Sequence, residues 1–308
     1  MQHKNSSEIL KFYEADSLET LDRLKDVFSH GALKDTGKII ISAVDQGFEH
    51  GPNRSFCMNL NAFDPHYHYQ LAVDAGLSAF AAPLGLLESG VKTFKGKIPT
   101  ILKLNSGNAL IHLDQPDQAL TASVEDAVRL GCHGVGITFY PGSAHSYSMI
   151  EKIQKISLEA RKAGLFVVIW SYPRGNMSKE GETALDVVSY GAHIACLLGA
   201  HIVKVKVPTP HLEKQLDRQA LEAHHVAIQT LKDRIRYVVR SSFNGRRVVI
   251  FSGGDVKTEN DLLAEIQAIH HGGGFGSIVG RNLFQRSRQE SLSLIEKIVN
   301  VYKSKDKQ

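Results

Sequence analysis

The chain has 308 residues, of which 43% are hydrophobic, and its formal net charge is +4 at pH 7. A chain of this length and composition can bury a substantial core, which excludes an intrinsically disordered protein. The small positive charge permits anionic ligands but falls short of the clustered basic stripe of a nucleic-acid-binding protein, so we expect no nucleic-acid partner. Phosphorylated metabolites fit this charge better.

The three cysteines, Cys57, Cys132 and Cys196, are odd in number and show no C-x-x-C spacing. Neither a disulfide framework nor a zinc cluster is therefore indicated. The N-terminus lacks the apolar stretch of a signal peptide, and no window of about 18 apolar residues is present to span a membrane. We expect a cytoplasmic protein with no membrane partner.

Eight short β-rich runs follow one another along the chain, most of them separated by segments of helical pattern. This order predicts an α/β fold, a (β/α)8 TIM barrel, as a single domain over residues 1–308 with an N-terminal helical extension at 1–35. The alternative is a doubly wound open sheet, but no glycine-rich dinucleotide fingerprint follows the first strand. The surplus length lies in excursions around 104–122 and 210–245. The predicted strands are 39–44, 78–82, 98–103, 134–138, 165–170, 201–206, 247–251 and 276–279.

The sixth run, GAHIVKVKVPT at 199–209, carries two lysines. Side chains alternate between the faces of a strand, so Lys204 and Lys206 share one face, opposite the valines. Desolvation and like charge would both favour the neutral amine, which would make a lysine nucleophilic toward a carbonyl. The alternative is a surface strand edge with two solvated lysines.

In a barrel of this kind the active face lies at the carboxyl ends of the strands. Asp45 follows the first strand and is a candidate acid, base or lysine partner, with a turn-capping role as the alternative. Tyr140 and Ser143 follow the fourth strand and are expected at the barrel mouth.

The fifth strand ends in VVIWSYPRG. Trp170 and Tyr172 share one face, and Arg174 lies just beyond. The indole can pack against a substrate while the phenol relays protons. The alternative for Trp170 is an aromatic side chain that fills the barrel interior.

The last two strands each run into a glycine turn and a helix, at 248–263 and 274–284. Backbone N–H groups at such turns form a phosphate site after strands seven and eight of a barrel, and the Arg281 guanidinium can add a charge-assisted contact. The alternative is a pair of ordinary tight turns. The residues predicted to bind the phosphate end of a substrate are Ser252, Gly253, Gly254, Gly280 and Arg281.

Five segments, from about residue 36 to 290, together resemble the archaeal type of class I fructose-bisphosphate aldolase, the DhnA family. They are DQGFEHGP, WSYPRG, GAHIVKVK, FSGGDVKTENDLL and VGRNLFQR, in the expected order and spacing. The resemblance implies that Lys204 forms the Schiff base, Tyr172 transfers protons and Asp45 is the acidic residue that ends strand one. It also implies that Trp170 shapes the ketose pocket and that the two glycine turns bind phosphate.

The implied reaction begins with attack of Lys204 on the C2 carbonyl of a ketose 1-phosphate and continues through a protonated iminium that accepts the electrons of the C3–C4 bond. The resemblance implies that the reaction needs no metal and no cofactor. It also implies that the protein is a homo-oligomer and that its substrate is a sugar phosphate. His50 is the one histidine expected near the pocket, and the alternative to a ligand role is a loop histidine bonded to backbone. Lys206 remains the reserve nucleophile.

Other interpretations of the same barrel remain open. A related Schiff-base aldolase or transaldolase-like enzyme would use the lysine on another ketose phosphate or a deoxy sugar. A phosphosugar isomerase would share the phosphate site but would have no use for Lys204. A non-catalytic sugar-phosphate sensor would bind without turnover. Which of Arg174, Arg281, Lys206 and Lys103 would hold a second phosphate is left undecided by the sequence.

Overall fold

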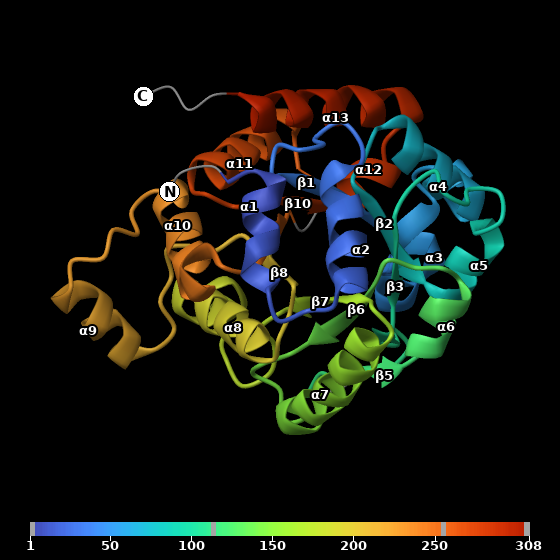
Figure 1. Ribbon diagram of the computed structural model, residues 1–308. Coiled ribbons are helices and arrows are strands. Elements are labelled where there is room, and N and C mark those ends of the chain that lie inside the picture. The colour runs from blue at the N-terminus through green and yellow to red at the C-terminus, as the bar shows by residue number, and fades with distance from the viewer. Residues whose placement is uncertain (1–3, 112–114, 254–256, 305–308) are drawn as a thin grey trace.

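The computed structural model describes residues 4–111, 115–253 and 257–304. Eight parallel strands close into a barrel in the order β1-β10-β9-β8-β7-β6-β3-β2, which confirms the predicted (β/α)8 fold and each of the eight predicted strand positions within two residues (Figure 1). The barrel strands are β1 Ile39–Ala43, β2 Ala79–Pro83, β3 Thr100–Lys103, β6 Gly134–Phe139, β7 Phe166–Ser171, β8 Ile202–Lys206, β9 Val248–Ser252 and β10 Gly276–Val279.

Helices surround the strands, and most begin at a side-chain cap. Ser123 and Thr230, for example, each accept a hydrogen bond from the backbone of the third helical residue, which satisfies one of the N–H groups left open at a helix start. The helices are α1 Ser6–Leu10, α2 Leu18–Ser29, α3 Gln46–Phe56, α4 Pro65–Asp74, α5 Leu84–Gly90, α6 Val124–Arg129, α7 Ser146–Lys162, α8 Leu185–Leu197, α9 Gln215–Ala223, α10 Leu231–Ser241, α11 Glu259–His271, α12 Arg281–Phe284 and α13 Arg288–Lys303, with 3-10 turns at Lys11–Tyr13, Leu60–Phe63, Gly181–Thr183 and Phe243–Gly245.

The two predicted excursions carry their own structure. The first contains a short antiparallel pair, β4 Asn105–Ser106 with β5 Ala119–Leu120. The second contains α9 and α10, and α9 projects away from the barrel (Figure 1). In the described part of the chain, no helix is long and apolar enough to cross a bilayer.

The barrel interior is filled by aromatic side chains that need glycine opposite them. A Cβ atom on Gly136 of β6 would lie 1.8 Å from the Trp170 ring, and one on Gly134 would lie 2.4 Å from the Phe166 ring. Both rings come from the neighbouring strand β7. Close packing of this kind leaves no room for a methyl group, so these glycines fix where the β7 side chains lie.

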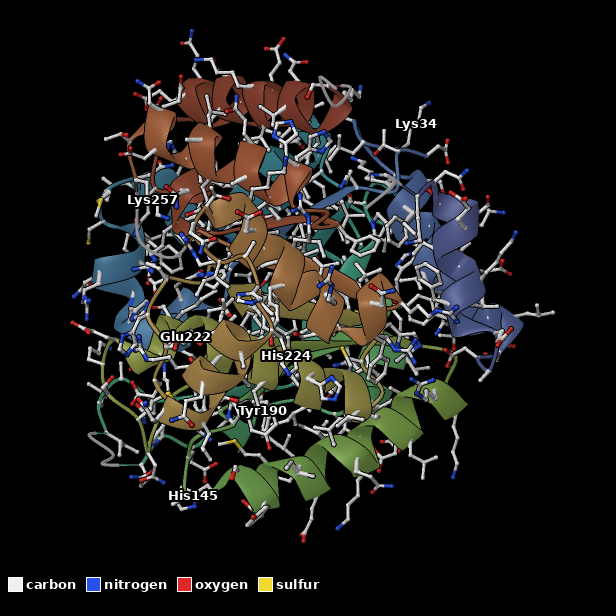
Figure 2. The ribbon with its side chains drawn as sticks, turned by 90° about the vertical axis from the view of Figure 1, so that its left-hand side faces the viewer. Lys34, His145, Tyr190, Glu222, His224 and Lys257 are labelled. Atoms are coloured by element: carbon white, nitrogen blue, oxygen red, sulfur yellow. The ribbon has the colours of Figure 1, made fainter. Side chains whose placement is uncertain are left out.

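The N-terminal extension closes one end of the barrel. The Tyr13 hydroxyl donates to the His201 carbonyl oxygen at 2.5 Å and accepts from the Val248 amide at 3.1 Å. Asp16 forms an ion pair with Arg161 and lies 3.2 Å from Nε2 of the buried His201. Because these contacts reach residues at the amino ends of β8 and β9, the extension lies opposite the face where the site was predicted. Figure 2 shows α1 and α2 at one side of the barrel and Lys257, in the loop after β9, at the other.

Candidate active site

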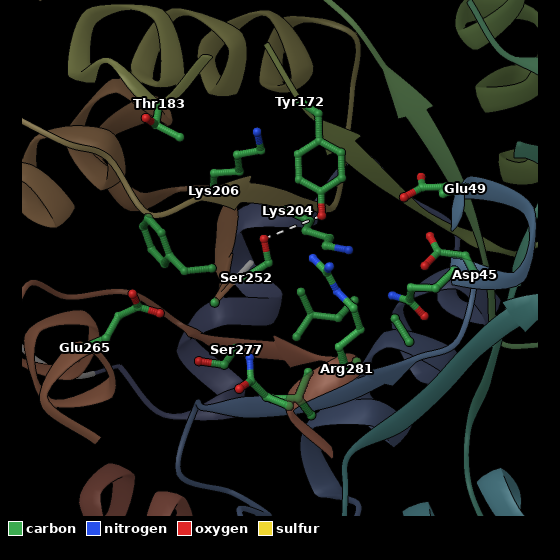
Figure 3. A pocket seen from close by; sticks show the side chains of 18 of the residues that line it. Asp45, Glu49, Tyr172, Thr183, Lys204, Lys206, Ser252, Glu265, Ser277 and Arg281 are labelled. Atoms are coloured by element: carbon green, nitrogen blue, oxygen red, sulfur yellow. Dashed lines mark hydrogen bonds between the residues drawn. The ribbon is translucent and has the colours of Figure 1, made fainter. Parts of the chain in front are cut away.

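A cavity of about 410 Å³ opens at the carboxyl ends of the strands. Figure 3 shows its side chains converging from β1, β7, β8, β9 and β10. The lining contains most of the predicted site residues, namely Asp45, Tyr172, Arg174, Lys204, Ser252, Gly253, Gly280 and Arg281, together with His50 and the reserve candidate Lys206. The barrel topology thus brings residues from five separate sequence segments to one space.

Lys204 lies on β8 with only 5% of its surface exposed. Its Nζ atom is 5.3 Å from the centre of the Trp170 ring and 5.1 Å from that of Tyr172. Burial lowers the pKa of Lys204 to about 8, against the opposing effect of Asp45 and Glu49, and Arg281 lowers it further. The amine is therefore nucleophilic far closer to neutral pH than an ordinary lysine.

The positive charge that helps to lower the pKa of Lys204 comes from Arg281 and not, as predicted, from Lys206. Lys206 shares the β8 face with Lys204, but its amine forms an ion pair with Glu182 at 3.1 Å. Figure 3 shows the two amines pointing in different directions. Because an ammonium paired with a carboxylate is compensated locally, Arg281 is the positive charge that acts on Lys204.

Two carboxylates face Lys204 from the helix that follows β1. Asp45 is the N-cap residue of α3, yet its side chain makes no capping bond, and it is buried. Glu49 lies one helical turn later, and Figure 3 shows both carboxylates on the same side of the cavity. Burial and the neighbouring Asp45 raise the pKa of Glu49. The sequence reasoning gave Glu49 no role of its own; its four-residue spacing from Asp45 was the signal that placed it on the same helix face.

Tyr172 follows β7 and directs its hydroxyl toward Ser252. The hydroxyl donates to Ser252 Oγ at 3.5 Å, and Ser252 in turn donates to the Val205 carbonyl at 3.3 Å (Figure 3). Burial raises the pKa of the phenol well above its usual value, and the Asp45 and Glu49 charges act in the same direction. The phenol is thus held protonated beside the reactive lysine.

Trp170 lies beneath this cavity with 1% of its surface exposed, and it is not among the lining residues. Its ring separates two buried amines: Lys204 lies 5.3 Å and Lys103 5.7 Å from its centre. Lys103 donates to the backbone oxygen of Asn105 and, at 3.2 Å, to its Oδ1 atom. Burial lowers the pKa of Lys103 to about 8. Neither Trp170 nor Lys103 lines the cavity, and Trp170 adjoins the site through Lys204.

The predicted phosphate end lies between β9 and β10. Gly253 and Gly280 follow these strands, and Arg281 begins α12. A Cβ atom on Gly280 would lie 2.9 Å from the Ala43 carbonyl oxygen and 2.8 Å from the side-chain Nε2 atom of Gln46, so this backbone approaches the end of β1 closely. Gly254, also predicted here, lies outside the described residues.

Other predicted residues surround the cavity. The Arg174 guanidinium lies 5.3 Å above the Tyr140 ring. Tyr140 is buried and accepts a hydrogen bond from Gln118 at 2.7 Å, while Ser143 donates to the Pro116 carbonyl at 2.6 Å. These two residues anchor the 115–118 loop and do not line the cavity.

His50 lines the cavity, and burial together with Arg281 and Arg54 lowers its pKa. Within the described ranges, no group of three or more histidine, cysteine, aspartate or glutamate side chains is placed to hold a metal ion.

A closed barrel with a buried lysine of lowered pKa, two carboxylates and a phenol at its carboxyl face defines a lysine-dependent barrel enzyme. The model of the DeoC/LacD family aldolases matches residues 39–286, and the chain belongs to this family. The resemblance found in the sequence is thereby confirmed.

Named relatives agree with this membership. The chain is 37% identical over 251 residues to the class 1 fructose-bisphosphate aldolase of Thermoproteus tenax, covering 81% of this chain and 84% of the relative. It is 34% identical over 308 residues to the probable class 1 fructose-bisphosphate aldolase of Chlamydia muridarum, covering 94% and 87%. A solved Schiff-base-forming fructose-1,6-bisphosphate aldolase matches with a TM-score of 0.75 and 33% identity over 90% of this chain and 99% of that one.

Proposed function

We propose that this protein is a class I fructose-bisphosphate aldolase that reversibly cleaves fructose 1,6-bisphosphate to dihydroxyacetone phosphate and glyceraldehyde 3-phosphate. The observation that carries the proposal is the Lys204 amine, whose pKa is lowered to about 8 at the centre of the cavity. An isomerase that uses a carboxylate base would have no use for such an amine. Membership of the DeoC/LacD aldolase family supports the same reaction class.

In the proposed reaction the neutral Lys204 amine attacks C2 of the open-chain ketose, and the carbinolamine loses water to give a protonated iminium. Breaking the C3–C4 bond sends its electron pair into the iminium, which becomes an enamine, while the C4 hydroxyl loses its proton and C4 becomes the aldehyde of the first product. Protonation of the enamine at C3 and hydrolysis of the resulting iminium release dihydroxyacetone phosphate and restore Lys204.

Tyr172 is the proposed proton-transfer residue. Because the raised pKa keeps its phenol protonated, it accepts the C4 proton only if its own proton moves on to an ionised group. Asp45 and Glu49 are the carboxylates that act on this phenol and on the Lys204 amine. We assign Asp45 to the carbinolamine steps and to charge balance with the lysine.

The C1 phosphate is assigned to the β9–β10 end of the cavity, at Ser252, Gly253, Gly280 and Arg281, with Gly254 retained from the sequence prediction. Trp170 supports Lys204 from below. A homo-oligomer and a cytoplasmic location stay predictions from the sequence.

The decisive experiment is borohydride reduction in the presence of dihydroxyacetone phosphate, followed by peptide mass mapping, with and without a chelator. We expect a stable adduct on Lys204 that a chelator leaves intact and that Lys204→Met abolishes. Lys206→Met is the matched control, since it removes the other amine of the same strand face, and it should keep the adduct. An adduct on Lys206 would overturn the assignment, and no adduct with either this ligand or fructose 1,6-bisphosphate would overturn the chemistry.

A further inference from the structure

Two buried polar residues of the cavity wall have no part in the proposed reaction. Glu265 of α11 and Asn282 of α12 both line the cavity, with 7% and 5% of their surface exposed. Figure 3 shows Glu265 across the cavity from Asp45, away from the carboxylates that act on Lys204. A buried carboxylate costs folding free energy and repels an anion bound nearby, so its presence at this end of the cavity calls for a physical reason.

The counterion of Glu265 is Lys257, which lies between β9 and α11. The Lys257 amine forms an ion pair with Oε2 of Glu265, and the two side chains are 34% and 8% exposed. The other carboxylate oxygen, Oε1, is buried and has no hydrogen-bond partner among the described residues. Burial raises the pKa of Glu265, and Lys257 opposes that effect. Lys257 is therefore the group that favours a charged carboxylate at this position.

The backbone of Lys257 is bonded to the chain that follows β10. Its amide donates to Oδ1 of Asn282 at 3.0 Å, and its carbonyl oxygen accepts from Nη2 of Arg286 at 2.8 Å. Nε of Arg286 also donates to the Asn282 carbonyl oxygen at 3.0 Å. Lys257 is thus attached to α11 through its side chain and to the chain after β10 through its backbone, next to Arg281.

Gly253, at the end of β9, packs against the same two side chains of the cavity wall. A Cβ atom on Gly253 would lie 3.3 Å from Oε1 of Glu265 and 3.6 Å from Nδ2 of Asn282. The carboxylate and the amide therefore form the surface against which Gly253 rests. Because Gly253 and Arg281 belong to the two halves of the proposed phosphate site, the spacing of these halves is set by groups that lie behind it.

We propose that Glu265 and Lys257 are positioning residues for phosphate binding, whose ion pair holds the chain after β9 against the chain after β10 so that both strand ends contact one phosphate group. This inference rests on the proposed function. Lys257 is not among the cavity-lining residues, so it acts through Glu265 and Asn282 and not by contact with the ligand. A site held in its binding geometry loses less free energy to ordering when the ligand binds.

The test compares borohydride trapping on Lys204 by dihydroxyacetone phosphate and by dihydroxyacetone, which lacks the phosphate. Lys257→Met removes the counterion, and Glu265→Gln keeps the shape of the side chain while it removes the charge. Both variants should raise the half-saturating concentration of dihydroxyacetone phosphate about tenfold, because misplaced binding groups lose contact. Trapping by dihydroxyacetone should stay within about a factor of two of the wild type. With fructose 1,6-bisphosphate, KM should rise while kcat changes little.

Lys297→Met is the matched control. Lys297 forms an ion pair with Glu259 of the same helix α11, but these side chains are 47% and 41% exposed and do not line the cavity. Since an exposed pair contributes little, this variant should trap both ligands as the wild type does. Circular dichroism checks that each variant is folded. If Lys257→Met is unfolded because it leaves a buried carboxylate without a counterion, Glu265→Gln carries the test.

Equal losses with both ligands would overturn the proposal, because the ion pair would then support the whole barrel mouth. Tighter binding of dihydroxyacetone phosphate in Glu265→Gln would also overturn it, since Glu265 would then act only as a repelling charge. An effect of Lys297→Met as large as that of Lys257→Met would do the same. Absence of an adduct on Lys204 in the wild type would refute the proposed function itself, whereas a wild-type adduct with unchanged phosphate dependence in both variants would refute only the role of the ion pair.

Discussion

The lowered pKa of Lys204 predicts how iminium formation depends on pH. With a pKa of about 8, roughly 9% of the amine is neutral at pH 7, whereas at the ordinary value of 10.5 about 0.03% would be. Burial therefore raises the concentration of the nucleophile about 300-fold at pH 7. The rate of iminium formation should rise about tenfold per pH unit below pH 7 and level off above a midpoint near 8.

The assay is single-turnover trapping with borohydride at saturating dihydroxyacetone phosphate, between pH 6 and 10 on the order of half-unit steps. Asp45→Asn and Glu49→Gln each remove a negative charge that raises the pKa of Lys204, so the midpoint should move to lower pH in both variants. Arg54→Gln serves as the control, since Arg54 is not among the groups that shift Lys204. Its midpoint should match that of the wild type.

A midpoint near 10 in the wild type would refute the reasoning, because it would mean that the amine is solvated when the substrate arrives. A midpoint that moves upward in Asp45→Asn would also contradict it, since the sign of the Coulomb interaction would then be wrong. A lower plateau with an unmoved midpoint would assign Asp45 to proton transfer alone.

Three further outcomes are expected. Tyr172→Phe should retain the borohydride adduct on Lys204 but cleave fructose 1,6-bisphosphate about 10²–10⁴ times more slowly, and loss of the adduct as well would give the phenol a different role. Lys204→Met should raise the free energy of unfolding in urea by up to about 3 kcal/mol at pH 7, because burial lowers the folded-state pKa of Lys204 and the unfolded chain therefore binds a proton more tightly. This gain should fade between about pH 8 and 10.5, and a gain that does not depend on pH would contradict the prediction. Burial lowers the pKa of His201. Burial would raise the pKa of Asp16, but its contacts with His201 and Arg161 outweigh that effect and lower it. Both residues therefore stabilise the fold at neutral pH. The contribution of His201 should be lost as pH falls below about 6.5, the ordinary pKa of histidine, whereas that of Asp16 should be lost only below about 4. His201→Gln should therefore flatten the pH dependence of the denaturation midpoint between about pH 7 and 5, and an unchanged slope would show that other histidines dominate.

The strand positions were predictable because each barrel strand is a short apolar run buried on both faces. The burial pattern of β6 and β7, for example, is continuous, as expected for parallel strands covered by helices. The order of strand ends then placed Asp45, Tyr172 and Lys204 at one face without any knowledge of contacts. Because strands and helices alternate regularly, the order of the strands in the sequence gives their order around the barrel.

Contacts between distant loops were not predictable in the same way. Strand alternation put Lys204 and Lys206 on one face correctly, but it gave no indication that Glu182, in a loop 24 residues earlier, pairs with Lys206. The role of Glu49 was missed for a related reason, since its pKa depends on burial by several elements at once. The alternative considered for Trp170 was an aromatic side chain that fills the barrel interior. The ring is buried there, and the absence of a side chain on Gly136 opposite it leaves room for the indole.

The two ends of β8 connect stability with chemistry. Burial of Lys204 costs folding free energy, because it removes the charged amine from the water that would stabilise it. Three residues before Lys204, about 10 Å away in an extended chain, His201 immediately precedes β8 and is held by Tyr13 and Asp16 of the N-terminal extension. The His201 Nδ1 atom also accepts the Val167 amide at 2.9 Å, so β7 and β8 are tied together below the site. A strand fixed at its amino end can hold an unfavourable amine at its carboxyl end in one position, and Tyr13 and Asp16 of the N-terminal extension fix the amino end of the strand that carries Lys204.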